Sequence, residues 1–256
     1  MTFKNTSIAF LISIGLICLF HFLAGISLWW MLVPFFIYNV LLVIGSANIQ
    51  SDFHIKALCH GDTNKKQIAI TFDDGPNREY TPKVLSLLEQ YDAKATFFVI
   101  GKNIIGNEEI LKRMDVAGHI IGNHTFSHSF FIDFKNANGF KDELNATADS
   151  VFKVTGKRMK LFRPPYGVTT PHLVRAAKEL NYQVIGWNVR SLDTTNDSKD
   201  KITSRVLEQL KPGAIVLFHD TSEKTLNVLK QTLESAGQSG FKIVMMDQLL
   251  STTNYE

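Results

Sequence analysis

Short apolar runs alternate with amphipathic stretches along most of the chain. Runs rich in β-branched and aromatic side chains predict seven strands, at 67–72, 95–101, 119–123, 160–163, 183–189, 213–219 and 241–246. Stretches with apolar residues three or four positions apart predict helices at 81–91, 107–118, 141–156, 170–181, 200–211 and 225–237. Such alternation is typical of parallel strands joined by right-handed helical crossovers.

The number of strands limits the fold class. Seven strands are slightly few for a complete (β/α)8 barrel. We therefore predict an α/β fold, a distorted (β/α) barrel with about seven parallel strands, and keep an open doubly wound sheet as the alternative. In both architectures the functional side chains lie at the carboxyl ends of the strands.

The N-terminal part of the chain is apolar throughout. From Asn5 to Ser51 no residue is charged apart from the titratable His21, over about twice the ~20 residues that cross a bilayer as one helix. The sequence predicts two transmembrane helices, at 8–24 and 28–44, with Trp29 and Trp30 at a membrane interface. The alternative is a single anchor, or an uncleaved signal followed by an interfacial helix.

The chain therefore divides into a membrane anchor at 1–45, a linker at 46–66 that wraps onto the domain, and an α/β domain at 67–256. Two spans would return the domain to the side of the N-terminus. The basic residues that flank the spans lie on that side and favour a cytoplasmic domain. A single span would place the domain outside, so the charge pattern leaves the topology open.

Composition excludes some partners and says little about others. The chain has 27 lysine and arginine residues against 24 aspartate and glutamate residues, a balance that argues against nucleic acid as a partner. Cys18 lies in the first predicted span and Cys59 in the linker. The two cysteines form no disulfide framework and have no local metal or nucleophile partner.

Two adjacent carboxylates follow the first predicted strand. Asp73 and Asp74 precede Gly75 and Pro76, which end the strand. Successive side chains of a strand point to opposite faces, but a Gly-Pro turn can aim both carboxylates at the space above the strand end. This arrangement indicates a site. An aspartate pair that only shapes the turn or caps the next helix is the alternative.

A histidine pair follows the third strand. His124 and His128 are four residues apart, which on one helical turn presents both imidazoles to one point. Together with Asp74 they would form a three-ligand set with open positions for water, as in a catalytic divalent-metal site.

Three more candidates stand at other strand ends. Arg163 can hold an aspartate of the pair ionised and oriented. His219 is a candidate proton donor, and Asp193 is placed to hydrogen-bond to it and raise its pKa. A helix N-cap is an equally good interpretation of Asp193 taken alone.

Four motifs carry a resemblance to a known family. The segments TFDDGP, HTFSH, RPPY and LFHD, in this order, resemble the motifs of polysaccharide deacetylases of the NodB homology type, carbohydrate esterase family four, over about residues 66–250. The resemblance implies a distorted (β/α) barrel. It also implies metal-dependent removal of N-acetyl, sometimes O-acetyl, groups from sugars.

The resemblance assigns roles to the candidates. It implies that Asp73 is the catalytic base and that Arg163 orients it. The implied metal ligands are Asp74, His124 and His128. We expect Zn²⁺ as the metal, with Co²⁺ or Ni²⁺ as alternatives.

Four further residues receive roles in the same way. The resemblance implies that His219 is the general acid, that Asp193 is its partner, and that a backbone N–H near Tyr166 helps to hold the oxyanion. Leu217 is expected to receive the acetate methyl group.

The chain departs from the family pattern at the cleft. Arg190 and Thr194 stand where the family usually has an aspartate and a tryptophan, which puts the form of the binding cleft in doubt. The expected partner is an acetylated polysaccharide, such as peptidoglycan or another cell-envelope glycan with N-acetylglucosamine, and the expected location is the cell membrane with an extracytoplasmic domain.

Three alternatives remain for the function. An O-acetyl esterase would use the same groups. A membrane-anchored glycan-binding module that has lost catalysis is the second, but such proteins usually lose a metal ligand or an acid, and none is missing here. A non-haem iron oxygenase shares the two histidines and one carboxylate, but the α/β alternation argues against it.

Overall fold

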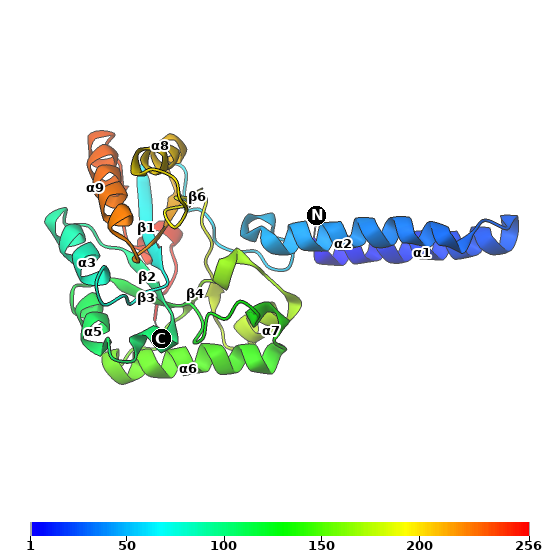
Figure 1. Cartoon of the computed structure of the whole chain (residues 1–256), viewed down its shortest axis with the longest axis horizontal. Coiled ribbons are helices and arrows are strands. Elements are labelled where there is room, and N and C mark those ends of the chain that lie inside the picture. Colours follow the sequence, from blue (N-terminus) through cyan, green and yellow to red (C-terminus); the bar gives the residue numbers. More distant parts are fainter. Residues whose placement is uncertain (1, 256) are drawn as a thin grey trace.

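The computed structural model describes residues 2–255, as an α/β domain from which an N-terminal helical hairpin projects (Figure 1). Every strand pairing in the sheet is parallel. The strands are β1 (Gln67–Asp73), β2 (Thr96–Val99), β3 (Ile120–Asn123), β4 (Leu161–Phe162), β5 (Gln183–Val184), β6 (Val189–Arg190), β7 (Ala214–His219) and β8 (Lys242–Ile243).

The strand order places β5 and β6, which are consecutive in the sequence, at opposite edges of the sheet. Seven strands form the path β5-β4-β3-β2-β1-β7-β6, and β8 pairs with β1. The predicted strand at 183–189 is wrong as a single strand, because β5 pairs with β4 at one edge whereas β6 pairs with β7 at the other. Between them, the N–H of Ile185 still donates to Phe162 while that of Asn188 donates to Ile215. This segment therefore runs from one edge of the sheet to the other. The distorted barrel predicted from the sequence is confirmed.

Helices cover the sheet on the outside, as Figure 1 shows for α3, α5, α6, α8 and α9. Several begin at a side-chain cap: Asn136, Thr170, Ser198 and Ser222 each accept a hydrogen bond from a backbone N–H of the first turn. The helices are α3 (Thr81–Gln90), α4 (Gly101–Ile104), α5 (Glu108–Val116), α6 (Ala137–Thr155), α7 (Pro171–Glu179), α8 (Lys199–Gln209), α9 (Glu223–Gln238) and α10 (Met246–Leu250).

The apolar core holds the three central strands together. Phe72 of β1 stacks on Phe97 of β2 and Phe218 of β7, with ring centroids 5.0 and 5.9 Å apart. All three rings are buried. Contacts of this kind fix neighbouring strands against each other, so the polar residues that follow these strands are held at one edge of the sheet.

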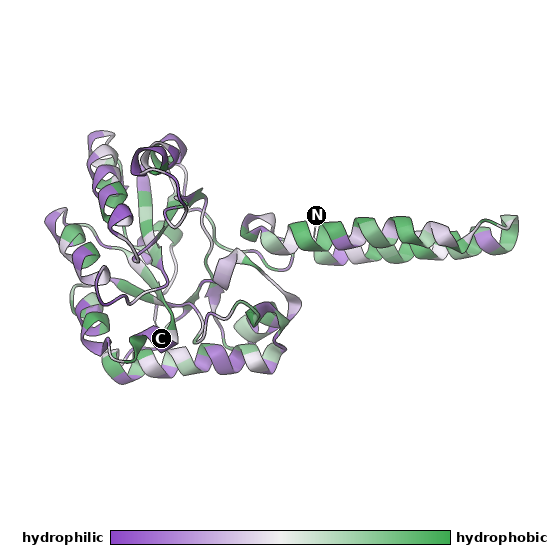
Figure 2. Cartoon of the chain, viewed as in Figure 1, coloured by the Kyte–Doolittle hydropathy of each residue, from purple (hydrophilic) through white to green (hydrophobic). Residues whose placement is uncertain are grey.

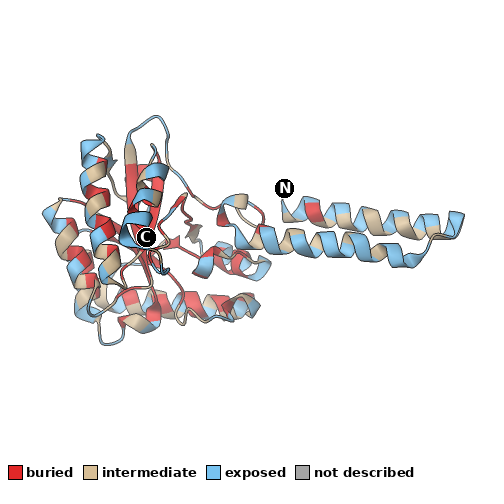
Figure 3. Ribbon diagram, turned by 45° about the horizontal axis from the view of Figure 1, so that its top comes forward, coloured by how far each residue is buried: buried red, intermediate tan, exposed pale blue. Residues whose placement is uncertain are grey.

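The N-terminal helices form an antiparallel hairpin. Helix α1 (Phe3–Ala24) turns through η1 (Leu28–Met31) into α2 (Leu32–Ala47). Phe10 stacks on Tyr38 at 4.5 Å between ring centroids. Both arms are long and apolar enough to cross a membrane, by length and composition. Figure 2 shows the hairpin as predominantly hydrophobic, and Figure 3 shows that its residues are mostly exposed or half-buried.

The linker lies against the domain. Leu58 forms a bridge with Ile185, and His60 forms one with Ala214 at the start of β7. The N–H of Thr169 donates to the carbonyl of Ser46, near the end of α2, at 2.9 Å. The hairpin thus meets the domain close to the loop that follows β4.

Candidate functional site

The aspartate pair lies at the carboxyl end of β1. Asp73 is the last residue of the strand and pairs in register with His219 of β7. Asp74 has a left-handed backbone, with φ 76°, which is rare for a residue with a side chain. The chain therefore reverses at Asp74 itself, and both carboxylates line one pocket.

Only glycine fits at position 75, because the chain passes close to Asp220, the residue that follows β7. A Cβ at this position would clash with the Asp220 carboxylate. Asp220 is fully buried and accepts a hydrogen bond from the hydroxyl of Thr81. Burial raises the pKa of Asp220 to about 7. The glycine of the first motif and the aspartate of the last are thus packed against each other.

The histidine pair lies in an irregular loop, so the predicted helical turn is wrong. Thr125 and His128 have positive φ values of 65° and 45°. The imidazoles still converge, because each Nε2 lies 3.5 Å from Oδ1 of Asp74. The loop supplies the convergence that a helix would have given by periodicity.

Glu143 of α6 holds this loop in place, and the sequence analysis did not identify it. Its carboxylate accepts from the backbone N–H groups of Phe126 (3.0 Å) and Ser127 (2.7 Å) and from the hydroxyl of Ser127 (2.8 Å). Burial raises the pKa of Glu143, but these donors and Lys135 outweigh it, so the pKa falls below its usual value. The available signal in the sequence was the position of Glu143, which follows Phe140 by three residues and so falls on the apolar face of this helix.

Asp74, His124 and His128 fit a divalent metal. Their ligand atoms lie within 4.8 Å of one another. Oδ1 of Asp74 is buried without a hydrogen-bond partner in the described residues. Burial lowers the pKa of His124 to about 3, so its imidazole is neutral near pH 7. Its Nδ1–H donates to the carbonyl of Arg163 at 2.7 Å, which leaves Nε2 as the ligand atom.

Arg163 connects β4 to the aspartate pair. The guanidinium is fully buried and donates to Oδ1 of Asp73 at 2.8 Å. It also donates to the hydroxyl of Thr71 and to the carbonyl of Gly186. Burial raises the pKa of Asp73, and the guanidinium offsets part of this shift. Asp73 is thereby held in one orientation, with a pKa above that of an ordinary aspartate.

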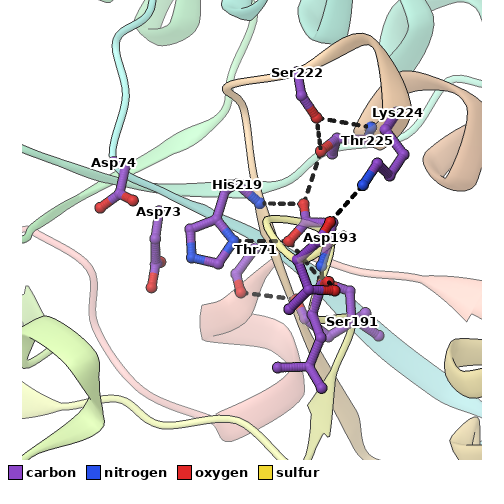
Figure 4. Close-up of polar contacts among 12 residues, drawn as sticks. Thr71, Asp73, Asp74, Ser191, Asp193, His219, Ser222, Lys224 and Thr225 are labelled. Carbon is purple, nitrogen blue, oxygen red and sulfur yellow. Dashed lines mark hydrogen bonds and ion pairs between the residues drawn. The ribbon is translucent and has the colours of Figure 1, made fainter. Parts of the chain in front are cut away.

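His219 and Asp193 form a second pair. Nδ1–H of His219 donates to Oδ1 of Asp193 at 2.8 Å, and the backbone N–H of His219 donates to Oδ2. Thr225 also donates to this carboxylate. Figure 4 shows the His219 ring between Asp193 and Asp73. Burial lowers the pKa of His219, but the hydrogen bond and charge of Asp193 dominate, and the pKa rises to about 9.

Replacing Asp193 with asparagine should lower the pKa of His219 by more than one unit, because it removes the dominant source of the shift. The folded pKa exceeds the unfolded value of 6.5. The stability that this pair contributes is therefore complete below pH 6.5 and lost as the pH rises through about 9.

NMR titration of the His219 ring in both proteins measures this shift. The exposed His172 on α7 is the internal reference. An unchanged His219 titration in the asparagine variant would show that Asp193 does not set the pKa.

One pocket of about 270 Å³ gathers these groups. Of the predicted site residues it is lined by Asp73, Asp74, His124, His128, Tyr166, Leu217 and His219. Arg163 and Asp193 lie behind this wall as the buried partners of Asp73 and His219. All nine predicted residues therefore belong to one region of the structure.

The pocket has four further lining residues, of which the sequence placed Arg190 and Thr194 at the cleft but not Trp187 and Leu192. Trp187, Arg190, Leu192 and Thr194 line it together with the predicted residues. Arg190 and Thr194 replace the family's usual side chains, but Trp187 still supplies an indole to the wall. Trp187 precedes β6, whereas the sequence analysis looked for functional side chains at the carboxyl ends of strands, so this role was not predicted.

Comparisons with known proteins agree with this arrangement. A family model for polysaccharide deacetylase matches residues 60–185. A peptidoglycan-N-acetylglucosamine deacetylase of Bacillus cereus is 34% identical over 197 residues, which cover 75% of this chain and 71% of that protein. The peptidoglycan-N-acetylmuramic acid deacetylase PdaA of Bacillus subtilis is 36% identical over 194 residues, or 74% of this chain and 73% of that protein.

A solved structure is similar over the same region. The crystal structure of the Bc1960 peptidoglycan N-acetylglucosamine deacetylase matches with a TM-score of 0.74 and 32% identity, over 77% of this chain and 94% of that chain. These matches confirm the resemblance that the four motifs carry, and with it the predicted enzyme class, a hydrolase of non-peptide carbon–nitrogen bonds. The chain belongs to the polysaccharide deacetylase family.

Proposed function

We propose that this protein removes N-acetyl groups from a cell-envelope glycan that contains N-acetylglucosamine, such as peptidoglycan, with a divalent metal as cofactor. The observation that carries the proposal is the content of one pocket. It combines a three-residue ligand set, an arginine-held carboxylate and a histidine–aspartate pair. The names of the similar proteins support the same substrate class.

In the proposed mechanism Asp74, His124 and His128 hold the metal. When bound, a divalent metal supplies a Lewis acid that polarises the acetyl carbonyl and makes water more acidic. Asp73 accepts the proton of the attacking water. Its raised pKa brings the base closer to neutral pH, where proton transfer is more efficient. Arg163 keeps the carboxylate aimed at the pocket.

The acetyl group is held by the pocket walls. We assign the backbone N–H of Tyr166 to the oxyanion, a type of contact worth on the order of 3 kcal/mol. Tyr166 has φ 58°, an unfavourable backbone at a site where strain is often functional. Leu217, buried at the pocket wall, receives the acetate methyl group.

Protonation of the leaving amine falls to His219. With a pKa of about 9, the imidazole carries its proton at neutral pH. Its Nδ1–H is engaged by Asp193, so Nε2–H is the proton available to the pocket. Donation to the amine nitrogen as the C–N bond breaks converts a poor leaving group into a neutral amine.

We also propose that residues 1–45 are a two-span membrane anchor, that 46–66 is the linker and that 67–256 is the catalytic domain. The hairpin supports two spans, because the N–H of Phe3 donates to the carbonyl of Phe53, which follows α2. Both ends of the hairpin therefore return to the domain. The class of substrate favours a domain outside the cytoplasm.

The proposed function predicts metal-dependent acetate release. Full-length protein in detergent should release acetate from N-acetylglucosamine oligomers. Chelator should reduce the rate by at least ~100-fold, and Zn²⁺ should restore it, since the Lewis acid contributes several kcal/mol. Enzymatic acetate determination measures the rate, and Co²⁺ and Ni²⁺ test the identity of the metal.

Other results would redirect the proposal. Release that is insensitive to chelator would contradict metal dependence. Release only from O-acetylated sugars would identify an esterase. Glycan binding without release under any metal would favour a binding module.

A further inference from the structure

Arg190, the last residue of β6, faces the pocket. Arg190, Leu192 and Thr194 line the pocket, whereas the intervening Ser191 and Asp193 are buried beneath them. Leu192 has a positive φ of 58°, so the chain turns here and does not continue as a strand. The hydrogen bond between Asp193 and His219 anchors this turn at the edge of the pocket.

The guanidinium is supported by a rigid aromatic wall. The Cζ atom of Arg190 lies 5.6 Å from the centroid of the Trp187 ring, within the range of a cation–π contact. Trp187 is only 7% exposed. A Cβ at Gly167 would meet the indole at 2.5 Å, so the backbone at Gly167 packs closely against the edge of the ring. Arg190 therefore stacks on an indole that is buried and closely packed.

No carboxylate of the described residues pairs with Arg190. Three of the other described arginines have such partners: Arg163 pairs with Asp73, Arg175 with Glu179 and Arg205 with Asp197. The pocket carboxylates face other groups: Asp73 is paired with Arg163, and Asp74 points to the metal position that it shares with the two histidines. Arg190 is the one lysine or arginine in the described lining, and its N–H donors are available to a ligand.

We propose that Arg190, supported by Trp187, forms an anion subsite that takes a carboxylate carried by the acetylated sugar. A guanidinium donates two parallel hydrogen bonds to a carboxylate, an arrangement that no neutral hydroxyl reproduces. N-acetylmuramic acid bears such a carboxylate on the lactyl group next to its acetamido group, and N-acetylglucosamine does not. The inference rests on the proposed deacetylase function and selects between these two sugars.

The test compares one substrate with and without its charge. Oligosaccharides with N-acetylmuramic acid are assayed beside the same compounds with the lactyl carboxylate converted to a methylamide. We expect wild-type kcat/KM to favour the acid about tenfold, the value of a charged hydrogen-bonded contact. In Arg190→Gln this preference should fall to about one, through KM rather than kcat.

A matched variant controls for the loss of a stacked arginine. Arg158 lies over Phe152 at 4.6 Å, outside the pocket lining, so Arg158→Gln removes a similar contact. This variant should keep the tenfold preference. Arg190→Glu should reverse it, so that the methylamide becomes the better substrate.

A binding experiment separates the subsite from catalysis. Calorimetry on chelator-treated, full-length protein measures the affinity for N-acetylmuramic acid without turnover. Arg190→Gln should weaken it about tenfold and leave the affinity for the methylamide unchanged. If no sugar releases acetate but this binding difference is found, the proposed function fails and the subsite stands.

Equal treatment of acid and amide by the wild-type protein, in both assays, would overturn the subsite. The same holds for an Arg190→Gln variant that weakens both ligands equally. Arg190 would then be a stacked surface arginine that does not sense the charge of the sugar.

Discussion

Replacing Asp74 with alanine should reduce acetate release by at least ~1,000-fold. The carboxylate is one of three side chains that converge on the metal position, and its Oδ1 has no other partner in the described structure. Without it, two imidazoles and no carboxylate remain to hold a dication, and the loss of Lewis-acid assistance costs ~4 kcal/mol of activation free energy. Metal stoichiometry by mass spectrometry and acetate release are measured on the same preparation.

Two variants separate the carboxylate from the backbone at this position. Asp74→Gly removes the same ligand but suits the left-handed φ of 76°, so it should be at least as stable as the alanine variant and equally inactive. Asp149→Ala makes the same chemical change on the exposed side of α6 and should leave activity and metal content unchanged. An Asp74→Gly protein with bound metal and more than a tenth of wild-type activity would contradict the ligand role.

Loss of the His219 imidazole should slow N-deacetylation by ~10² to 10⁴-fold, the usual contribution of a positioned general acid. The raised pKa of about 9 keeps this side chain protonated at neutral pH, where it supplies the proton that the leaving amine needs. The measurement is kcat for His219→Ala on an N-acetylglucosamine oligomer. The exposed His172→Ala on α7 should match the wild type.

The leaving group distinguishes an acid from a structural residue. The leaving group of an aryl acetate is a stable phenolate, which needs little protonation. His219→Ala should therefore slow hydrolysis of the aryl acetate much less than hydrolysis of the amide. His219→Ala also leaves Asp193 as a buried, unpaired carboxylate, which is destabilising. The double variant with Asp193→Ala removes that charge and should show the same selectivity. Equal losses on amide and aryl ester would contradict the role of general acid.

Much of the fold follows from local patterning. The alternation of apolar and amphipathic segments predicted a parallel sheet with outer helices because both periodicities are local properties of the chain. The predicted strand at 183–189 was wrong for the same reason. Gly186 and Trp187 continue an apolar run, yet the sheet pairs its two ends with strands at opposite edges. Pairing partners far apart in sequence leave no local periodic signal.

The sequence by itself determined the apolar hairpin, the α/β class and the identities of the nine candidate residues, since these rest on composition, spacing and motifs. Only the tertiary structure decided how those residues meet. Asp74 turns the chain by its own left-handed backbone, and Glu143 shapes the histidine loop in place of a helical turn. Arg190 came to face the pocket on a Trp187 wall. These three features depend on contacts between distant segments and on which side of the backbone is buried. Local spacing in the sequence encodes neither of these two properties.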